Sequence, residues 1–561
     1  MTNNEFLSIG KTRTWSWVGL GAALAVYITL SVRHIWCPGL GYDEVMWTSV
    51  AINRPDGGWI AWSIGRWPVL LSLPYIGALK GYIYAPILTF FGTNPLSIRL
   101  PMILLGAAGI AITFAAARRS IGVTSAVLIA LFLAINPEIV QRLRHDLGPA
   151  APDFVLRAAC LLFLLRYAEN ERPRDAILFW LLACIGVWQK LTFIWYINAY
   201  VLAFVVLQGK SWISRRRTTG IIRALLPHAL SYLAVVAWVG WVYVTFHVAE
   251  VQASLGSGAG TPPLVRIVTF GKALGLFLQG IETITEFHDP FFVPKAATFF
   301  LLMLLTFVAV GMMRGVREVF RPPAGGVSFR GIIALAALAV TIQVTITLPA
   351  DKVWHRLSLE PFVTWLAVDG IITAAAAVAS LLSRPAAVRA TFTAITCITA
   401  LGGIAYSAQI HRYLDRTLCS PSVHHRSFSR AIQTPAIWRL LDLVASSNRR
   451  FVFLDWGMRN QALLVTRDPE RVVEYAWLRE DTAEAQFFAE KFITTDNRDA
   501  FVLHGPEYTC VPSTRVAFQN IARVRHIPMR ILSVIEEDGA IAFEIWEVER
   551  HEHASDSAHP L

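Results

Sequence analysis

The sequence predicts a polytopic α-helical membrane protein with about eleven transmembrane helices and a C-terminal α/β domain. Three observations support this fold class. The chain of 561 residues is 55% hydrophobic and only 16% charged, which is too apolar for a soluble protein of this length. Apolar runs of about 17–22 residues recur along the first part of the chain, and such runs match the thickness of a bilayer core. Basic residues fall in short clusters between these runs.

The expected spans follow from the apolar runs taken in order. They cover residues 15–32, 100–117, 121–136, 150–165, 175–189, 191–208, 224–246, 296–313, 331–348, 361–382 and 390–409. If the N-terminus is cytoplasmic, every basic cluster lies in a cytoplasmic loop, as the positive-inside rule requires. One apolar run near an N-terminus could be a signal peptide, but a long series cannot. The net charge of +11 therefore reflects membrane topology, and no nucleic-acid partner is expected.

The loops on the opposite, extracytoplasmic side are expected to carry the polar chemistry. The first, residues 33–99, contains VMWTSVAI and WPVLLSLPYIGAL, which are too short to span. Both are predicted to lie as interfacial helices at the level where tryptophan is favoured. Three later loops contain RLRHDLGPAAPD, TEFHDPF and DKVWHRLSLEPF.

The composition becomes polar after residue 410. We expect a membrane domain over 1–410, an extracytoplasmic α/β domain over 411–550 and a disordered tail over 551–561. RFVFLDWG and AFEIWEV are typical of strands, and TAEAQFFAEKF of an amphipathic helix. Cys419 and Cys510 would lie in an oxidising compartment, where they either pair or remain free thiols. Cys37, in the first outer loop, has no obvious partner.

Asp43 and Glu44, in GYDEV after the first span, are the first candidate catalytic residues. A carboxylate at the mouth of a cavity is partly desolvated, and it can take a proton from an attacking hydroxyl. The general base is assigned to Asp43. Glu44 would point about 100° away on a helix, and it is given a supporting or acceptor-binding role. In the alternative interpretation, both carboxylates cap the next helix and interact with its dipole.

Further charged residues map to the same face, where ionisable groups at membrane depth indicate function. Asp146 precedes a rigid Gly-Pro bend and could orient the acceptor or assist the base. Asp153 is expected to pair with Arg157 one helical turn later. Lys190 lies in an apolar setting and needs either an anion, which a lipid phosphate would supply, or a path along which its ammonium reaches the interface as an anchor. The other candidates for binding this phosphate are Lys80, Arg66, Arg356 and His355, each of which could instead be an interfacial anchor.

Nucleotide-binding motifs are absent from the sequence, which contains neither GxxxxGK[ST] nor GxGxxG. An enzyme with an outward-facing site and no nucleotide motif most simply uses an activated donor carried in the membrane. No ligand spacing for a dedicated metal site is evident, so no cofactor is predicted. Whether a divalent cation binds between Asp43 and Asp146 is a question that the sequence leaves open.

A transporter or lipid flippase is the main alternative. Transporters commonly have inverted repeats and charges at the midplane in broken helices. Here the charges gather at one face, and neither half of the chain resembles the other.

Four segments together resemble the GT-C glycosyltransferases, and within them family 39, which includes protein O-mannosyltransferases and lipid A aminoarabinose transferases. The segments are GYDEV, LPYIGALKGYIYAPILTFFGTNPLSIRLP, RHDLGPAAPD and GVWQKLTFIWYI. The resemblance covers residues 15 to about 210, and the later spans only by topology.

The resemblance implies a membrane glycosyltransferase with interfacial helices in its first outer loop. It implies a polyprenyl-phosphate sugar donor, an inverting transfer to a glycan, lipid or protein acceptor, and an active site facing out of the cytoplasm. Asp43 then corresponds to the expected base and Asp146 to the second acidic residue. Lys80 and Lys190 correspond best to the cations that bind the donor phosphate. A bacterial inner membrane with a periplasmic active site is the expected location.

Overall fold

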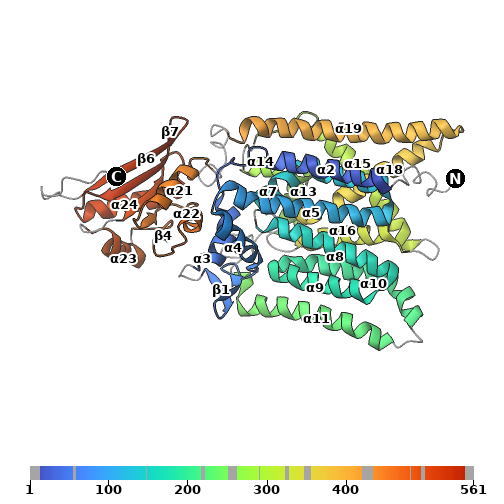
Figure 1. Cartoon of the computed structure of the whole chain (residues 1–561), viewed down its shortest axis with the longest axis horizontal. Coiled ribbons are helices and arrows are strands. Elements are labelled where there is room, and N and C mark those ends of the chain that lie inside the picture. The colour runs from blue at the N-terminus through green and yellow to red at the C-terminus, as the bar shows by residue number, and fades with distance from the viewer. Residues whose placement is uncertain are drawn as a thin grey trace.

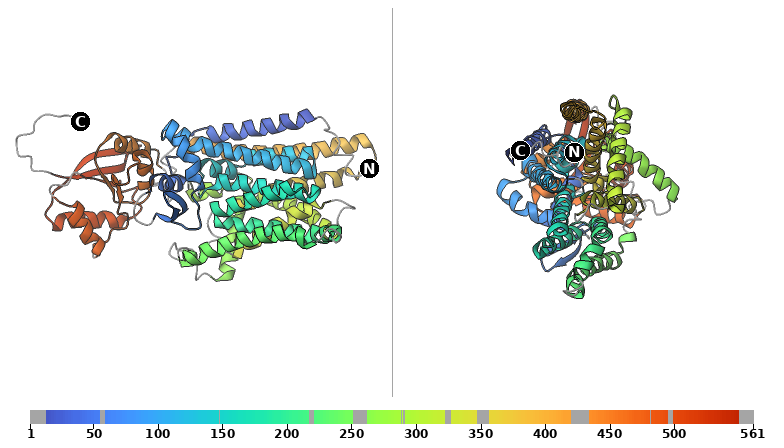
Figure 2. Two further views of the ribbon diagram at one scale, coloured as in Figure 1. Left: turned by 60° about the horizontal axis from the view of Figure 1, so that its bottom comes forward. Right: turned by 90° about the vertical axis from the view of Figure 1, so that its right-hand side faces the viewer.

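The protein consists of a helical bundle with an α/β unit at one end (Figure 1). The structure is a computed structural model that describes residues 13–54, 59–146, 148–216, 221–250, 262–287, 289, 291–321, 327–346, 356–419, 434–480, 482–494 and 499–549. The tail predicted over 551–561 lies outside these residues. The left-hand view of Figure 2 shows the α/β unit beyond the same end of the bundle.

Each of the predicted spans is a helix. They are α2 (Arg13–Val32), α5 (Pro95–Ile121), α6 (Val123–Ile135), α8 (Ala150–Asn170), α9 (Pro173–Gln189), α10 (Ile194–Arg216), α11 (Ile221–Thr245), α15 (Ala297–Phe320), α16 (Phe329–Ile346), α18 (Phe362–Ala379) and α19 (Pro385–Thr417). Seven of them are long and apolar enough to cross a membrane, and α6 with α7 (Pro137–His145) forms a further candidate that bends by 61°. Helices α8 to α10 are shorter or more charged, but they lie within the bundle, where α8 packs against α5, α9 against α8, and α10 against α16.

The first outer loop differs in part from the prediction. VMWTSVAI lies in helix α3 (Tyr42–Asn53), as expected. WPVLLSLPYIGAL is not a helix, because Trp67–Leu71 forms strand β2 and pairs antiparallel with β1 (Ile60–Ile64). Gly65 makes this hairpin possible, since its φ of +56° suits the turn. Helix α4 (Leu79–Phe91) then leads to α5.

Short helices occupy the remaining loops at this end of the bundle. Helices α13 (Pro263–Leu278) and α14 (Glu282–Phe287) lie in the third outer loop, for which the sequence analysis made no prediction of secondary structure. The 3₁₀ segments Leu191–Phe193 and Leu357–Leu359 precede α10 and α18. These pieces bring polar chain segments together at the end that faces the α/β unit.

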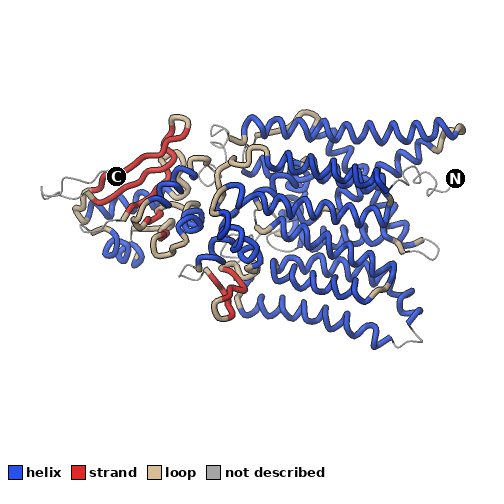
Figure 3. Tube along the Cα trace, viewed as in Figure 1, coloured by secondary structure: helices blue, strands red, loops and turns tan. Residues whose placement is uncertain are grey.

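The C-terminal α/β unit contains one five-stranded mixed sheet in the order β4-β3-β5-β7-β6. Strands β3 (Phe451–Phe453), β4 (Val472–Glu474) and β5 (Ala500–His504) are parallel, whereas β6 (Met529–Glu537) and β7 (Ala540–Val548) form an antiparallel hairpin. Its helices are α21 (Ile437–Ser446), α22 (Arg459–Thr466), α23 (Ala483–Phe492) and α24 (Pro512–Val524). The predicted strands and the predicted helix are all confirmed, and Figure 3 shows strands only here and in the β1–β2 hairpin of the described chain.

Helix α22 packs against α3 and joins the two parts of the molecule. The ring of Trp456 lies 5.0 Å from that of Tyr42. The Gln461 side-chain amide donates a hydrogen bond to the Leu40 carbonyl at 3.1 Å. Helix α3 is therefore held between the membrane bundle and the α/β unit.

A disulfide bond between Cys37 and Cys419 links the first outer loop to the segment after α19. The pairing of Cys419 with Cys510 that the sequence analysis considered is wrong, because Cys510 is a free thiol. Their shared place in the predicted extracytoplasmic domain suggested that pair. The fold instead brings together two cysteines that are 382 residues apart.

Alkylation of the denatured, unreduced chain tests this pairing. The wild-type chain should take up label at the four free cysteines. Cys37→Ser should add one labelled site, because it releases Cys419. Cys510→Ser should remove one. Intact-mass spectrometry measures the count, and the reverse pattern for the two variants would show that Cys419 pairs with Cys510.

Candidate active site

Helix α3 carries the two adjacent carboxylates in its first turn. Glu44 accepts a hydrogen bond from the backbone N–H of Gly41 at 3.1 Å. Acidic groups at this end of a helix are favoured by its dipole. The capping interpretation therefore describes Glu44.

Glu44 also forms a buried ion pair with Arg99 of α5. The Nε and Nη2 atoms of Arg99 donate to the two carboxylate oxygens at 2.7 and 2.9 Å. The same guanidinium donates to the backbone carbonyls of Ile35 at 2.6 Å and Gly39 at 3.1 Å. Burial acts to raise the pKa of Glu44, but Arg99 outweighs it and lowers this pKa. Glu44 is thus a charged structural residue that fixes the first outer loop on α5.

Lys80 and Asp146 form a second buried ion pair beside the first. The ammonium of Lys80 lies 2.7 Å from Asp146 Oδ2 and donates to the Glu44 carbonyl at 2.7 Å. Asp146 ends α7 in the left-handed region, with φ 48°, and its Oδ1 accepts from the Ala151 N–H at 2.7 Å. Neither side chain of the pair is more than 1% exposed. The pair joins α3, α4 and the loop between α7 and α8.

Asp43 differs from its neighbour because the residue retains some accessible surface, whereas Glu44 is buried. Within the part of the chain that the structure describes, no hydrogen bond or ion pair engages this side chain. Desolvation raises the pKa of Asp43 to about 6, while the Lys80 charge opposes the rise. A carboxylate whose pKa is raised in this way is a stronger base than an ordinary aspartate.

Lys190 reaches the same region from the end of α9. Ile76 and Lys190 form an isolated antiparallel bridge, and the Lys190 ammonium donates to the Gly148 carbonyl at 3.0 Å. The side chain is buried, and desolvation lowers the pKa of Lys190 against the attraction of Asp153. The structure therefore brings Asp43, Glu44, Lys80, Asp146 and Lys190 into one cluster, which we call the carboxylate–lysine cluster.

The predicted pair of Asp153 and Arg157 is confirmed, with 3.3 Å between Oδ2 and Nη2. Arg157 also donates to the Tyr196 hydroxyl at 2.9 Å and to the Leu357 carbonyl at 2.8 Å. It thereby ties α8 to α10 and to the segment before α18.

The other predicted phosphate-binding residues lie elsewhere. Arg356 is buried against Glu282, which also pairs with Arg142, so it belongs to a separate network of the outer loops. Arg66 is exposed at the tip of the β1–β2 hairpin, 5.0 Å from the ring centre of Trp67. His355 falls outside the described residues.

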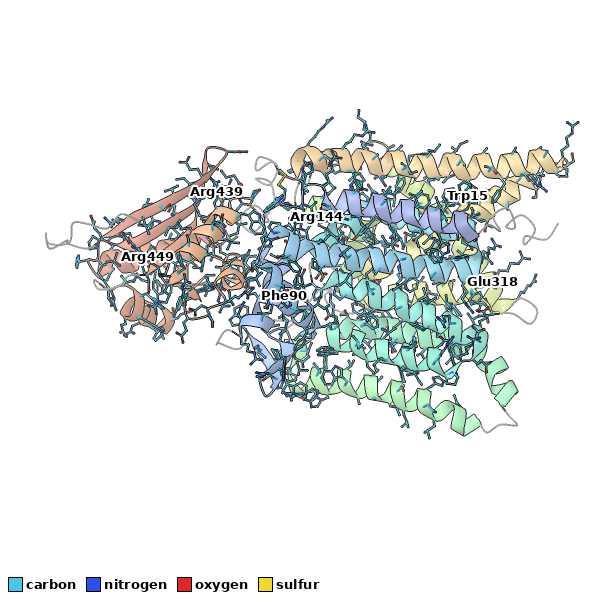
Figure 4. The ribbon with its side chains drawn as sticks, in the orientation of Figure 1. Trp15, Phe90, Arg144, Glu318, Arg439 and Arg449 are labelled. Atoms are coloured by element: carbon cyan, nitrogen blue, oxygen red, sulfur yellow. A yellow bond between two sulfur atoms is a disulfide. The ribbon has the colours of Figure 1, made fainter. Side chains whose placement is uncertain are left out.

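The sequence analysis missed Arg99 and Glu360. Arg99 is the one charge in the apolar stretch LSIRLPMILL, and an arginine at membrane depth is the signal that could have revealed it. Glu360 is 2% exposed, and burial raises its pKa to about 7. Figure 4 locates the cluster end, because Arg144 lies at the end of α7 beside the α/β unit and Glu318 at the far end.

Replacing Glu44 by Gln should destabilise the fold, because it leaves the buried Arg99 guanidinium without its counter-charge. Breaking a buried ion pair typically costs about 3–5 kcal/mol in the free energy of unfolding. Unfolding by SDS titration in mixed micelles measures this.

The matched control is Glu169→Gln, since Glu169 pairs with Arg119 on the surface. Exposed pairs contribute about 0–1 kcal/mol. If both variants lowered the free energy of unfolding by the same amount, the buried pair would not stabilise the fold more than the surface pair does.

Comparison with known proteins agrees with this architecture. Residues 78–244, which include Lys80, Arg99, Asp146 and Lys190, match the family model described as dolichyl-phosphate-mannose-protein mannosyltransferase. No curated protein sequence matches the chain.

Two solved structures share the fold at low sequence identity. One is ArnT from Cupriavidus metallidurans bound to undecaprenyl phosphate, with a TM-score of 0.53, 14% identity, and coverage of 95% of this chain and 98% of that one. The other is the archaeal oligosaccharyltransferase AglB from Archaeoglobus fulgidus, in complex with an inhibitory peptide and a dolichol-phosphate. Its TM-score is 0.51 at 14% identity, and the match covers 97% of this chain and 75% of AglB. The chain therefore matches this family over α4 to α11 and shares its overall fold with these two structures.

Proposed function

We propose that the protein transfers a sugar, hexosyl or pentosyl, from a polyprenyl-phosphate donor to an acceptor hydroxyl, with Asp43 as the general base. The donor class is supported by the undecaprenyl phosphate and the dolichol-phosphate in the two similar structures. The acceptor is a hydroxyl of a glycan, a lipid or a protein. The protein acts as an integral membrane enzyme, in a bacterial inner membrane with the carboxylate–lysine cluster facing the periplasm.

One observation carries the assignment of the base. Asp43 and Asp146 both interact with Lys80, but only Asp146 is in direct contact with it. Glu44 is likewise occupied by Arg99. Of the three carboxylates in the cluster, Asp43 is the one that keeps accessible surface and a basicity raised toward neutral pH. A general base needs both properties.

The reaction is a single displacement at the anomeric carbon. The acceptor oxygen forms a bond to this carbon as its proton passes to the Asp43 carboxylate. The bond between the anomeric carbon and the phosphate oxygen breaks, and the electron pair leaves with the lipid phosphate. Attack opposite the leaving group inverts the anomeric configuration.

Lys190 is the better candidate for the leaving phosphate. The Lys80 ammonium already donates to Glu44 and to Asp146 through short contacts. Among the described residues, the Lys190 ammonium donates to the Gly148 carbonyl alone, so two of its three N–H groups remain for phosphate oxygens. A fixed cation beside the developing phosphate charge stabilises the transition state. Lys80 then acts by holding Asp146 and by moderating the pKa of Asp43.

The α/β unit supplies the acceptor side of the site. Trp456 packs on Tyr42, the residue before Asp43, and Glu474 and Arg459 act electrostatically on Tyr42. Burial raises the pKa of Glu474 to about 7, with Arg459 opposing. These polar groups at the edge of the sheet can hydrogen-bond an acceptor that approaches Asp43 between the two parts of the molecule.

Asp43→Asn should abolish transfer while donor binding persists. Loss of a general base typically costs about 10²–10⁴-fold in rate. A strain lacking the gene would first reveal the acceptor, through mass spectrometry of its lipid-linked sugars and surface glycans. Complementation with the variant then reports turnover, and native mass spectrometry of the purified protein reports retained undecaprenyl phosphate.

Asp415→Asn is the matched control, since Asp415 lies near the same end of the bundle and pairs with Arg33 instead. It should restore the glycan. Turnover of Asp43→Asn equal to that of this control would exclude Asp43 as the base.

The pH dependence of transfer should reflect the raised pKa of Asp43. The base acts as the carboxylate, which is the major form above the pKa of about 6. As pH falls below this value, kcat/KM should decrease about tenfold per pH unit, because the ionised fraction decreases by that factor. Initial rates between pH 4.5 and 8 measure the profile. A rate that stays constant down to pH 4.5 would indicate a base with an ordinary carboxylate pKa.

A further inference from the structure

The α/β unit contains a second cluster of chemically active side chains, away from the carboxylate–lysine cluster. Asp455 follows β3, and His504 is the last residue of β5. These two strands are parallel neighbours, with Phe453 opposite Val502, so both residues lie at the carboxyl edge of the sheet. Ligands of open parallel sheets bind at this edge.

The loop after β5 brings a third residue to the same place. Gly505 lets the chain pass close to β7, because a Cβ atom there would lie 1.7 Å from the Ile541 carbonyl oxygen. The backbone N–H groups of Cys510 and Val511 then donate to the two oxygens of Asp455, each at 3.0 Å. One ligand atom from each of Asp455, His504 and Cys510 lies within 4.8 Å of the others.

His504 is the observation that points to a ligand. Its side chain is completely buried, yet neither ring nitrogen has a hydrogen-bond partner among the described residues. Its Nδ1 lies 3.1 Å from Asp455 Oδ2 without the alignment of a hydrogen bond. An unpaired buried polar group costs about 1–3 kcal/mol. A group bound between the imidazole and its neighbours would remove this cost.

Cys510 is the second unusual member. The disulfide of Cys37 and Cys419 leaves it as a free thiol in the α/β unit, and it is the one member of the cluster that is partly accessible. An ion could therefore enter past its sulfur atom. A larger substrate could not reach His504, which has no exposed surface. This argues against a Cys-His nucleophilic site.

We propose that Asp455, His504 and Cys510 form a zinc-binding site. A sulfur, an imidazole nitrogen and a carboxylate oxygen are the ligands that Zn²⁺ uses, whereas Ca²⁺ and Mg²⁺ require mostly oxygen. Three protein ligands leave the fourth tetrahedral position to water. Binding releases the thiol proton to solvent, and the sulfur coordinates as thiolate. Zn–ligand bonds of about 2.0–2.3 Å require the ligand atoms of Asp455, His504 and Cys510 to move closer together through small side-chain rotations.

The site has a structural consequence for the proposed active site. Asp455 immediately precedes Trp456, whose ring packs on Tyr42 beside Asp43. Zinc bound at the strand ends would fix this turn and hence the surface against which α3 rests. The ion would position the turn at Trp456 and take no part in the reaction, since none of its ligands touches Asp43.

Zinc content tests the proposal directly. The full-length protein, purified in detergent with a histidine-free tag, is incubated with Zn²⁺ and dialysed against metal-free buffer. Elemental mass spectrometry should find about one zinc ion per chain. Cys510→Ser and His504→Gln should each lower zinc retention at least tenfold. The matched control, Cys397→Ser, removes an exposed free cysteine of α19 and should retain the ion.

Cobalt provides a second measurement that is specific for the sulfur ligand. Co²⁺ bound to the wild-type protein should produce a thiolate charge-transfer band in the near ultraviolet, and Cys510→Ser should lose it. The histidines at 551, 553 and 559 of the tail cannot produce this band. Wild-type protein without zinc, or a band and zinc content that are unchanged in Cys510→Ser, would overturn the proposal. Size-exclusion chromatography identifies misfolded variants. If His504→Gln misfolds, the result for Cys510→Ser alone decides the test.

Discussion

Two interlocked ion pairs at one end of the bundle organise the rest of the structure. Glu44 with Arg99, and Lys80 with Asp146, place four charges where almost no water reaches. The free-energy cost of burying a single unpaired charge in such surroundings would be prohibitive. Two positive and two negative groups instead neutralise each other and satisfy one another's hydrogen bonds. The residues come from α3, α4, α5 and the turn after α7, so the pairs also fix these four elements relative to one another.

The same arrangement explains how two adjacent carboxylates have different roles. Glu44 pairs with Arg99 and accepts a hydrogen bond from the backbone at the start of its own helix. Asp43 lies outside the pairs. The nearby charge of Lys80 acts to lower its pKa, but desolvation raises this pKa by more than Lys80 lowers it. Structural charges that are fully compensated thus create the low-polarity setting in which the proposed base, one uncompensated carboxylate, has a raised pKa.

Helix α3 receives support from both parts of the molecule. The bundle holds it through Glu44, while the α/β unit holds it through the packing of Trp456 on Tyr42 and the hydrogen bond from Gln461 to Leu40. The disulfide at Cys37 restrains the chain just before it. The proposed base lies in this short helix and depends on such support from both sides, because a helix of twelve residues has little stability of its own in isolation.

Local composition by itself determined the spans and two strands of the α/β unit, β3 and β7, because burial in lipid and backbone propensity depend on short stretches of sequence. The sequence also indicated Asp43, Asp146 and Lys190 correctly as neighbours at one face. It could not indicate partners. Glu44 meets Arg99 across 55 residues and Cys37 meets Cys419 across 382, and such contacts depend on how whole helices pack. The strand at Trp67–Leu71 was likewise decided by its partner β1, since an apolar stretch of that length suits either conformation until a neighbour accepts its hydrogen bonds.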